Sequence, residues 1–231
     1  MRFSHHPAIW TAYPELVAGV LSARGIRADA AAEAAVARYE DIARQRLQAA
    51  GSESDLPQVQ AWRRVFSRMG LKPTQYRCAS ESLLRRLRKE GAMSRIHPLI
   101  DLCNALSMAF ATPVAAFDTA QVHESLQVRL ADGTERYLPF GGEIEHPEPG
   151  EVVFVDAQGN AHARRWTNRQ SGLSAVREGT REVLIVAEAV HAGAAQDMPR
   201  LAGAIAGAVH EVWGTTPTTK ILSAGDPVFD L

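Results

Sequence analysis

The sequence predicts an α+β protein in which N-terminal helices pack on a mainly antiparallel β-sheet. The main observation is a change of period near Pro113: apolar residues recur at helical spacing before it and alternate with polar residues after it. The 231 residues are 46% hydrophobic and 22% charged, which is typical of a globular protein with a sizeable core. We expect residues 1–55 to form an N-terminal helical extension and residues 56–231 to form the main domain, with a C-terminal helix.

Three helices are predicted before the change of period. Residues 27–51 are rich in Ala, Arg and Glu, the best helix formers, and end at a glycine. Residues 57–70 begin with Pro57 in the first turn and also end at a glycine. Residues 80–91 carry leucines on one side and cationic residues on the other, which predicts a core face and a cationic ridge.

Residues 94–118 indicate an apolar helix that runs into a buried strand, with Asp101, Asn104 and Ser107 at every third position. Positions three apart lie near one another on a helix, and polar side chains among apolar ones need partners or line a cavity. This polar row therefore indicates either local hydrogen bonds or a site.

The second half of the chain predicts strands and one more helix. Residues 125–140 alternate around an Asp-Gly turn and predict a hairpin. Residues 149–166 repeat this plan around a Gln-Gly-Asn turn, and residues 181–190 are a continuous apolar strand suited to the middle of a sheet. A helix is predicted over residues 197–214, and the tail after it has no clear period.

The charge of the chain is unevenly distributed. The formal net charge is -1, but residues 60–100 hold ten cationic residues against Glu81 and Glu90, so this segment alone is about +8. A one-sided basic surface attracts polyanions, and we expect it to contact nucleic acid, although a solvated helix face is the alternative. The predicted contacts are Lys72, Arg77, Arg85, Arg88 and Lys89.

Several common signatures are absent, including a glycine-rich phosphate loop and the Gly-x-Ser-x-Gly, Cys-x-x-Cys and His-Glu-x-x-His motifs. Cys78 and Cys103 are too few for a disulfide framework, and we assign neither a catalytic role. The neighbours His5 and His6 rarely present both rings to one ion, so no metal and no cofactor is expected. No apolar run reaches the roughly 20 residues of a membrane helix, and the start lacks the secretory layout, so we expect a cytoplasmic protein without a membrane partner.

The densest polar and aromatic cluster of the second half lies at residues 163–171. Forked cations, an indole and amides suit a carboxyl ester, a phosphate or a base. A twisted edge strand whose arginines face water is the alternative. The residues of the cluster are Arg164, Arg165, Trp166, Asn168, Arg169 and Gln170.

Residues 72–118, 149–171 and 177–188 together resemble the B3/B4 domain of the β chain of bacterial phenylalanyl-tRNA synthetase, and still more the freestanding proteins that carry this domain alone. The similarity runs from about residue 60 to residue 190. The family pattern of Val-or-Ile-Asp, two residues and Asn is met by Ile100, Asp101 and Asn104, and its Phe-Asp by residues 117 and 118. The resemblance implies a B3/B4-like fold.

The resemblance also implies a function. In the synthetase this domain hydrolyses the ester between a wrong amino acid and tRNA, and freestanding relatives do so in trans; one kind removes canavanine, an arginine analogue, from tRNA for arginine. Asn104 falls where the synthetase domain has a pocket-lining asparagine. Ala115 stands at the place of a synthetase histidine, and the polar run from Trp166 to Gln170 replaces a glycine pair followed by glutamate. These departures indicate a substrate more polar than tyrosine.

The chain is thus expected to act as a deacylase of mischarged tRNA, without a nucleophile, because an activated ester needs only a held water and donors for the developing oxyanion. A cationic substrate side chain would need a carboxylate, with Asp101, Glu143 and Glu81 as the acids considered. The catalytic candidates are Asn104, Asn168 and Gln170. The substrate-binding candidates are Asp101, Glu143, Gly141, Gly142, Arg165 and Trp166.

Two other functions stay open: a tRNA-binding module with an inactive site, and a small-molecule hydrolase on the same fold. Retained binding without release of an amino acid would indicate the first, and activity that survives neutralisation of the cationic helix would indicate the second. The particular tRNA and the oligomeric state are left open.

Overall fold

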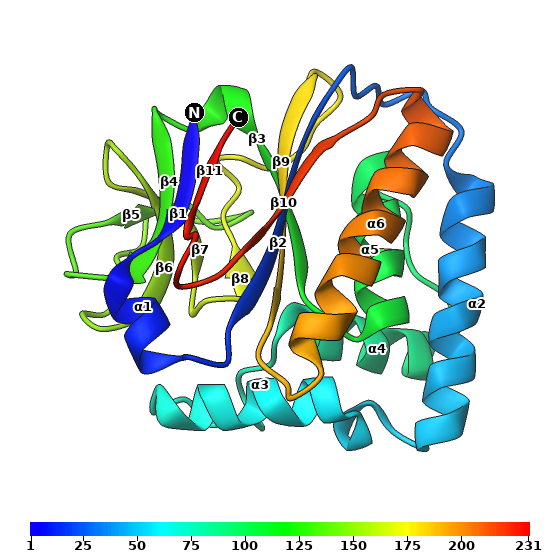
Figure 1. Ribbon diagram of the computed structural model, residues 1–231, viewed down its shortest axis with the longest axis horizontal. Helices are drawn as coiled ribbons and strands as arrows, with labels where there is room; N and C mark the ends of the chain where they lie inside the picture. Colours follow the sequence, from blue (N-terminus) through cyan, green and yellow to red (C-terminus); the bar gives the residue numbers. More distant parts are fainter.

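The structure is a computed structural model that describes all residues, 1–231. Its elements form three layers: a seven-stranded sheet, a four-stranded sheet, and a layer of helices that covers the outer face of the smaller sheet (Figure 1). The predicted α+β class is confirmed. The expected single sheet is instead two, because the strands after Pro113 divide between two layers.

The four-stranded sheet is antiparallel throughout, in the order β10-β2-β9-β3. Its apolar strand β9 (Glu182–Ala189) lies between two neighbours, so the prediction of a central strand is confirmed. The other strands are β2 (Val17–Arg24), β3 (Val114–Asp118) and β10 (Thr218–Leu222).

The seven-stranded sheet has the order β11-β1-β4-β6-β7-β5, with β8 paired to β7, and contains two parallel pairs, β1 with β4 and β5 with β7. The predicted hairpin over residues 149–166 is confirmed, and Gly159 takes the left-handed φ of 79° that its turn requires. The strands are β1 (Arg2–His5), β4 (Ser125–Leu130), β5 (Arg136–Tyr137), β6 (Val152–Asp156), β7 (Asn160–Arg164), β8 (Arg169–Gln170) and β11 (Val228–Asp230).

The hairpin predicted over residues 125–140 is wrong. β4 pairs with β1 and β6, whereas β5 runs parallel to β7. The turn is held locally instead, because Glu135 accepts hydrogen bonds from the backbone N–H groups of Asp132 and Gly133. Alternation predicts a strand correctly here but does not name its partner.

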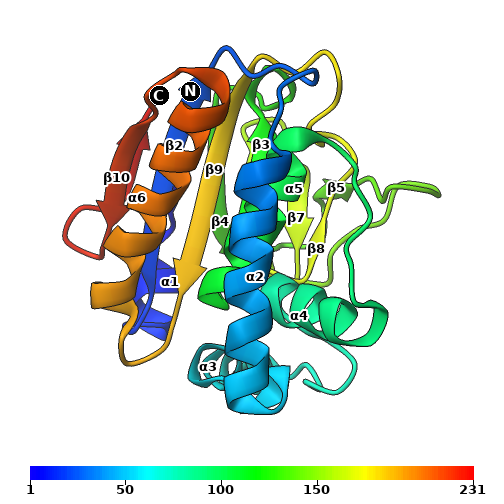
Figure 2. The same ribbon diagram turned by 90° about the vertical axis from the view of Figure 1, so that its right-hand side faces the viewer.

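The predicted helices are all present. α5 (Pro98–Phe110) and α6 (Ala194–Trp213) pack on the smaller sheet, and α2 (Glu33–Ala50) lies across α5 on the outside (Figure 2). α3 (Pro57–Arg68) and α4 (Ala79–Glu90) close one end of the layers, and the remaining helices are α1 (Pro7–Ala12) and the short η1 (Glu53–Asp55) and η2 (Thr119–Gln121). None of these helices combines the length and the apolar composition that crossing a membrane requires.

The first 55 residues contribute more than helix. β1 lies inside the larger sheet, and β2 lies inside the smaller one, where it pairs with β9 along its whole length. β1 is only 4 residues long, too short for a clear period, which is why sequence patterning missed it. The N-terminal segment is therefore built into both sheets.

Aromatic side chains fill the space between the two sheets. Phe117 of the smaller sheet packs on Phe154 of the larger one with ring centroids 5.5 Å apart, and Phe3 lies 6.1 Å from Phe154. Trp62 of α3 and Trp166 close the same core with centroids 5.1 Å apart. This inter-sheet core borders a cavity to which several residues of the predicted polar cluster contribute.

Candidate active site

A cavity with a volume of about 70 Å³ opens between the two sheets. This is room for several water molecules, since one needs roughly 10–15 Å³ on the same measure. Its walls come from β3, β6, β7, β8 and β9, from residues 166–168 and from the first residue of α4. Most of the wall is apolar, and its polar members are Glu188, Thr167, Asn168, Arg169 and Gln170.

Trp166 reaches the cavity through an unusual turn. Arg165 and Trp166 have φ values of 49° and 56°, a left-handed conformation that bulky residues rarely adopt. The turn brings the Trp166 indole into the core, where it is 1% exposed and packs edge-on to Trp62 and Tyr13. Two consecutive strained residues persist only where their surroundings hold them, and they often mark functional sites.

Glu188 is the carboxylate of the cavity, and it is not among the site residues predicted from the sequence. Although it lies in β9 and is 2% exposed, it lines the cavity. Its Oε1 accepts hydrogen bonds from His5 Nε2 at 2.7 Å and from Trp166 Nε1 at 3.0 Å. Oε2 accepts no hydrogen bond from the protein and is therefore the oxygen available to a molecule in the cavity.

Asn168 and Gln170 meet at this cavity, as their predicted roles require, but their amino groups are already engaged. Asn168 Nδ2 donates to the carbonyl of Arg77 at 2.8 Å, and Gln170 Nε2 donates to the carbonyl of Ala116 at 2.7 Å. Since a carbonyl can only accept, each amide must turn its NH₂ to the protein and keep its oxygen free. The cavity thus presents acceptors more than donors.

Thr167 supplies the remaining neutral polar group of the wall. Its Oγ1 is buried and has no hydrogen-bond partner in the protein. A hydroxyl can both donate and accept, but this oxygen is closed off from the cavity by its burial. Nothing in the sequence distinguished it from the neighbouring polar residues.

Of the three arginines of the cluster, Arg164 is buried and paired with Glu145 and Glu151, and the other two lie at the edges of the cavity. Arg165 stacks over the Tyr76 ring at 4.9 Å and lies 3.8 Å from Glu151, outside the cavity. Arg169 lines the cavity and is exposed, 3.4 Å from Glu145. Arg169 is therefore the one cation of the cavity wall.

The other predicted site residues do not line this cavity. Asn104 is half-buried on α5 and makes no side-chain hydrogen bond, and Gly141, Gly142 and Glu143 lie in an exposed loop. That loop starts near the cavity-lining Gln170. Gly172, two residues after Gln170, donates its backbone N–H to the carbonyl of Leu138, just before the loop, at 2.8 Å. The roles proposed for these residues stay predictions.

The polar row on α5 is explained by local hydrogen bonds at its two ends. Asp101 Oδ1 accepts from the backbone N–H of Ile96 at 3.0 Å, and Ser107 Oγ donates to the carbonyl of Thr112 at 2.7 Å. Burial raises the pKa of Asp101, against the lowering effect of the Ile96 N–H and of Arg95. Asp101 lines a separate cleft beside His97, away from Glu188.

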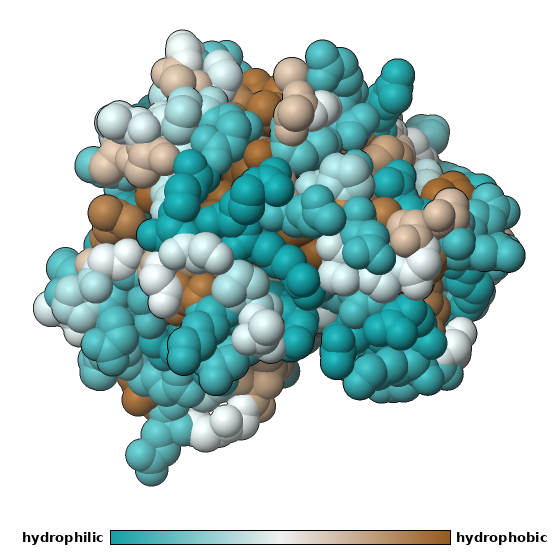
Figure 3. Space-filling view, turned by 90° about the horizontal axis from the view of Figure 1, so that it is seen from below, coloured by the Kyte–Doolittle hydropathy of each residue, from teal (hydrophilic) through white to brown (hydrophobic).

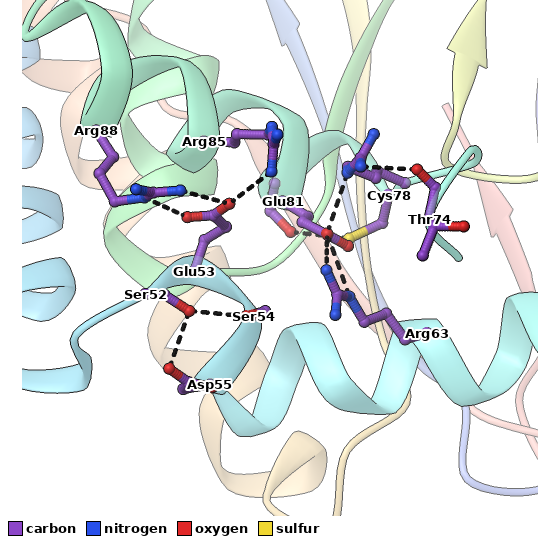
Figure 4. Close-up of polar contacts among 12 residues, drawn as sticks. Ser52, Glu53, Ser54, Asp55, Arg63, Thr74, Cys78, Glu81, Arg85 and Arg88 are labelled. Carbon is purple, nitrogen blue, oxygen red and sulfur yellow. Dashed lines mark hydrogen bonds and ion pairs between the residues drawn. The ribbon is translucent and has the colours of Figure 1, made fainter. Parts of the chain in front are cut away.

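The cationic ridge is largely paired with buried carboxylates (Figure 4). Arg88 Nε donates to Glu53 Oε2 at 2.7 Å and Arg85 lies 3.5 Å from Glu53 Oε1, while Arg63 Nη2 donates to Glu81 Oε1 at 2.6 Å. Arg77 lies 3.4 Å from the same Glu81 oxygen. Glu53 was not included in the charge of about +8 assigned to residues 60–100, because it precedes that segment.

Lys72 and Lys89 are the predicted tRNA contacts that remain exposed and without an ion pair, while Arg77, Arg85 and Arg88 are paired. The face on which α3 lies is mostly hydrophilic (Figure 3). The basic helix α4 is tied to the cavity, because the backbone N–H of Ala79 donates to the carbonyl of Thr167 at 2.8 Å. Helix α4 thus carries part of the basic surface and, through Ala79, contributes to the cavity wall.

Two groups that resemble catalytic devices are buried elsewhere. His162 bridges Ser174 at 2.8 Å and Asp156 at 3.2 Å, but His162 and Ser174 are fully buried and line none of the cavities described here. Burial raises the pKa of Cys78 to about 11 and that of Cys103 to about 12, so both stay thiols. No three His, Cys, Asp or Glu side chains gather into a metal-binding cluster.

Fold and site together define an α+β protein whose two sheets enclose an apolar cavity with a carboxylate and several hydrogen-bond acceptors. The sequence profile of the B3/4 domain matches residues 61–210, more than half of the chain, and the chain belongs to this family. The predicted resemblance to the synthetase domain is thereby confirmed. The relation to freestanding deacylases stays a prediction.

The chain is similar to the β subunits of phenylalanyl-tRNA synthetases from two organisms. Over 101 residues the chain is 34% identical to the phenylalanine–tRNA ligase β subunit of Shewanella oneidensis, an alignment that covers 43% of the chain and 12% of the subunit. The crystal structure of an N-terminal fragment of the phenylalanyl-tRNA synthetase β-subunit from Pyrococcus horikoshii matches 93% of the chain and 49% of the fragment, with a TM-score of 0.49 and 11% identity. The chain thus spans only part of the length of each relative.

Proposed function

We propose that the protein is an aminoacyl-tRNA deacylase that acts in trans on a mischarged tRNA, with canavanyl-tRNA for arginine as its substrate. Membership of the B3/4 family and relation to a tRNA ligase subunit support a tRNA substrate. The observation that carries the choice of amino acid is the cavity, with its single carboxylate and free amide oxygens.

The cavity suits a side chain with an apolar stem and a donor-rich end. A guanidinium-like group offers several N–H donors and no acceptor, and a carboxylate is its best partner. Glu188 Oε2, Asn168 Oδ1 and Gln170 Oε1 would receive these donors, while Phe117 and Val186 would pack on the stem. Glu188 thereby takes the role that the sequence assigned to Asp101 or Glu143.

Hydrolysis then depends on positioning. The ester of an aminoacyl-tRNA is already activated, so a water held in line and a donor at the developing oxyanion are sufficient. Arg169 is the charged donor of the cavity wall. No covalent intermediate is required, which agrees with the finding that none of His162, Ser174 and the two cysteines lines the cavity.

The tRNA would lie over the basic side of α4. Lys89 of α4 and Lys72 of the segment between α3 and α4 are exposed and unpaired, and Arg169 lies at the cavity itself. Phosphate contacts release counterions, so affinity should fall steeply with salt. Because the tRNA supplies most of the binding energy, changes inside the cavity should alter kcat more than KM.

The test is release of the amino acid from a panel of charged tRNAs. We expect rapid release from canavanyl-tRNA for arginine, slow release from tyrosyl-tRNA and from the cognate arginyl-tRNA, and the same rates with a chelator present. Rapid release of tyrosine alone would contradict the proposed substrate. Tight tRNA binding with no release from any member of the panel would identify a binding module instead, and hydrolysis of small esters that ignores tRNA would identify a small-molecule hydrolase.

A further inference from the structure

His5 makes a buried contact with the carboxylate of the cavity from outside the region that defines the family. It lies on β1, is 2% exposed, and its Nε2 is 2.7 Å from Glu188 Oε1. The family match begins at residue 61, so β1 is an addition to the matched segment in sequence but a neighbour of the site in space. His5 does not line the cavity itself.

The surroundings of His5 fix its ring. Phe3 packs edge-on to it with centroids 5.3 Å apart, and Trp10 of α1 lies 4.9 Å away on the same N-terminal segment. Nδ1 is buried and has no hydrogen-bond partner. A carboxylate oxygen can only accept, so Nε2 must carry the proton that is donated to Glu188. The ring is thus held for one contact.

The consequence falls on Glu188. His5 and Trp166 both donate to Oε1, which fixes the plane of the carboxyl group and leaves Oε2 for the cavity. Neither donor is an arginine or a lysine, and no salt bridge other than that with His5 involves Glu188. The carboxylate is therefore oriented without being covered by a guanidinium.

We propose that His5 is a positioning residue of the active site, which acts through Glu188 and makes the N-terminal strand part of the catalytic unit. The inference rests on the proposed function. A carboxylate that rotates loses its alignment with the substrate side chain, and a substrate displaced by a small distance reacts much more slowly. His5 would thus set kcat without touching the substrate.

The experiment compares His5→Gln, which keeps an amino donor near the place of Nε2, with His5→Met, which removes it. With canavanyl-tRNA we expect His5→Met to lower kcat about tenfold with KM within about twofold, as loss of a hydrogen bond to a charged group would. We expect His5→Gln to stay within about threefold of wild type. The exposed neighbour provides a matched control, since His6→Gln should leave both constants unchanged.

A double-mutant cycle separates positioning from folding. In a Glu188→Gln background, His5→Met should change kcat by less than about twofold, because the group that it positions is gone. Equal losses in both backgrounds, or His5 variants that lower only the folded fraction and not the kcat of folded protein, would overturn the inference. Should His5→Met not fold, a His5→Gln kcat as low as that of Glu188→Gln would overturn it as well. A wild-type protein without activity would instead refute the proposed function.

Discussion

Two of the regions that bury carboxylates use them in opposite ways. Between η1, α3 and α4, Glu53 and Glu81 are each contacted by two arginines. Between the sheets, Glu188 receives an imidazole and an indole on one oxygen and keeps the other free. In the first region arginines neutralise the carboxylates. In the second, one carboxylate oxygen stays available to bind a molecule in the cavity.

The hydrogen-bond partners of a buried glutamate distinguish a structural role from a functional one, whereas the residue type does not. Glu53 joins η1 to α4, and Glu81 joins α4 to α3, so their arginines fasten the helices that close one end of the molecule. Breaking a buried pair on one side leaves an uncompensated charge, which makes such pairs indispensable without making them reactive. Glu188 is not paired with an arginine, and its free oxygen is available to a cavity large enough for water.

Glu188→Gln should have the largest effect on activity. The amide keeps the shape and removes the charge that pairs with the substrate cation, so we expect kcat for canavanyl-tRNA to fall by on the order of a hundredfold. The melting temperature should stay close to that of wild type, because His5 and Trp166 can still donate to the amide oxygen. Full activity in this variant would remove Glu188 from the site.

Glu81→Gln should show the reverse pattern. It leaves Arg63 and Arg77 without their shared carboxylate, in a place where the glutamate is 1% exposed, and we expect a loss of about 2–3 kcal/mol in the free energy of unfolding. Urea denaturation measures the loss. The kcat of the folded fraction should not change, and a large fall in kcat would show that the helix end also shapes the cavity.

A third comparison divides the basic surface into free and paired cations. Lys72→Ala with Lys89→Ala removes two exposed unpaired charges, so the slope of log affinity for tRNA against log salt should become shallower by roughly 0.7–0.9 per lost contact. The matched pair Arg85→Ala with Arg88→Ala should change the slope less, because Glu53 already opposes these charges, and should lower the melting temperature more. Filter binding over a salt series gives both slopes. The opposite ranking would mean that tRNA displaces Glu53 from its arginines.

The sequence predicted what depends on local pattern. Helix periods, the hairpin of residues 149–166 and the central strand β9 are encoded in consecutive residues, and all three are confirmed. Partners far apart in sequence were not predictable: β4 pairs with the N-terminal β1, and Glu53 reaches Arg88, 35 residues away. Asn168 and Gln170 were predicted to contribute to a pocket, and both line the cavity. Which of their amide atoms stay free depends on the carbonyls of Arg77 and Ala116, which the sequence pattern does not reveal.

One signal was present and unused. After Glu182 at its start, β9 is apolar except for Glu188, and a charge in the buried part of a strand must have partners or a task. The same test applied to His5 gives no signal, because a four-residue strand has too little pattern to show which face is buried. The site therefore combines a residue that close reading can find with one that only the fold reveals.

The smallest expected effect concerns acid stability. Burial alone would raise the pKa of Glu53, but the Arg88 hydrogen bond and the nearby charges of Arg88 and Arg85 bring it below its ordinary 4.5. A carboxyl group whose pKa is lowered by folding adds stability above the unfolded value, and that stability is lost as the pH falls through the folded value. Glu53→Gln should therefore lose stability at pH 7 but lose less than wild type between pH 7 and pH 3, by on the order of 1 kcal/mol. Glu151, whose pKa is also lowered, should keep part of the acid sensitivity in the variant. Urea midpoints at the two pH values give the difference, and parallel losses in both proteins would show that the arginines do not favour the ionised form of Glu53.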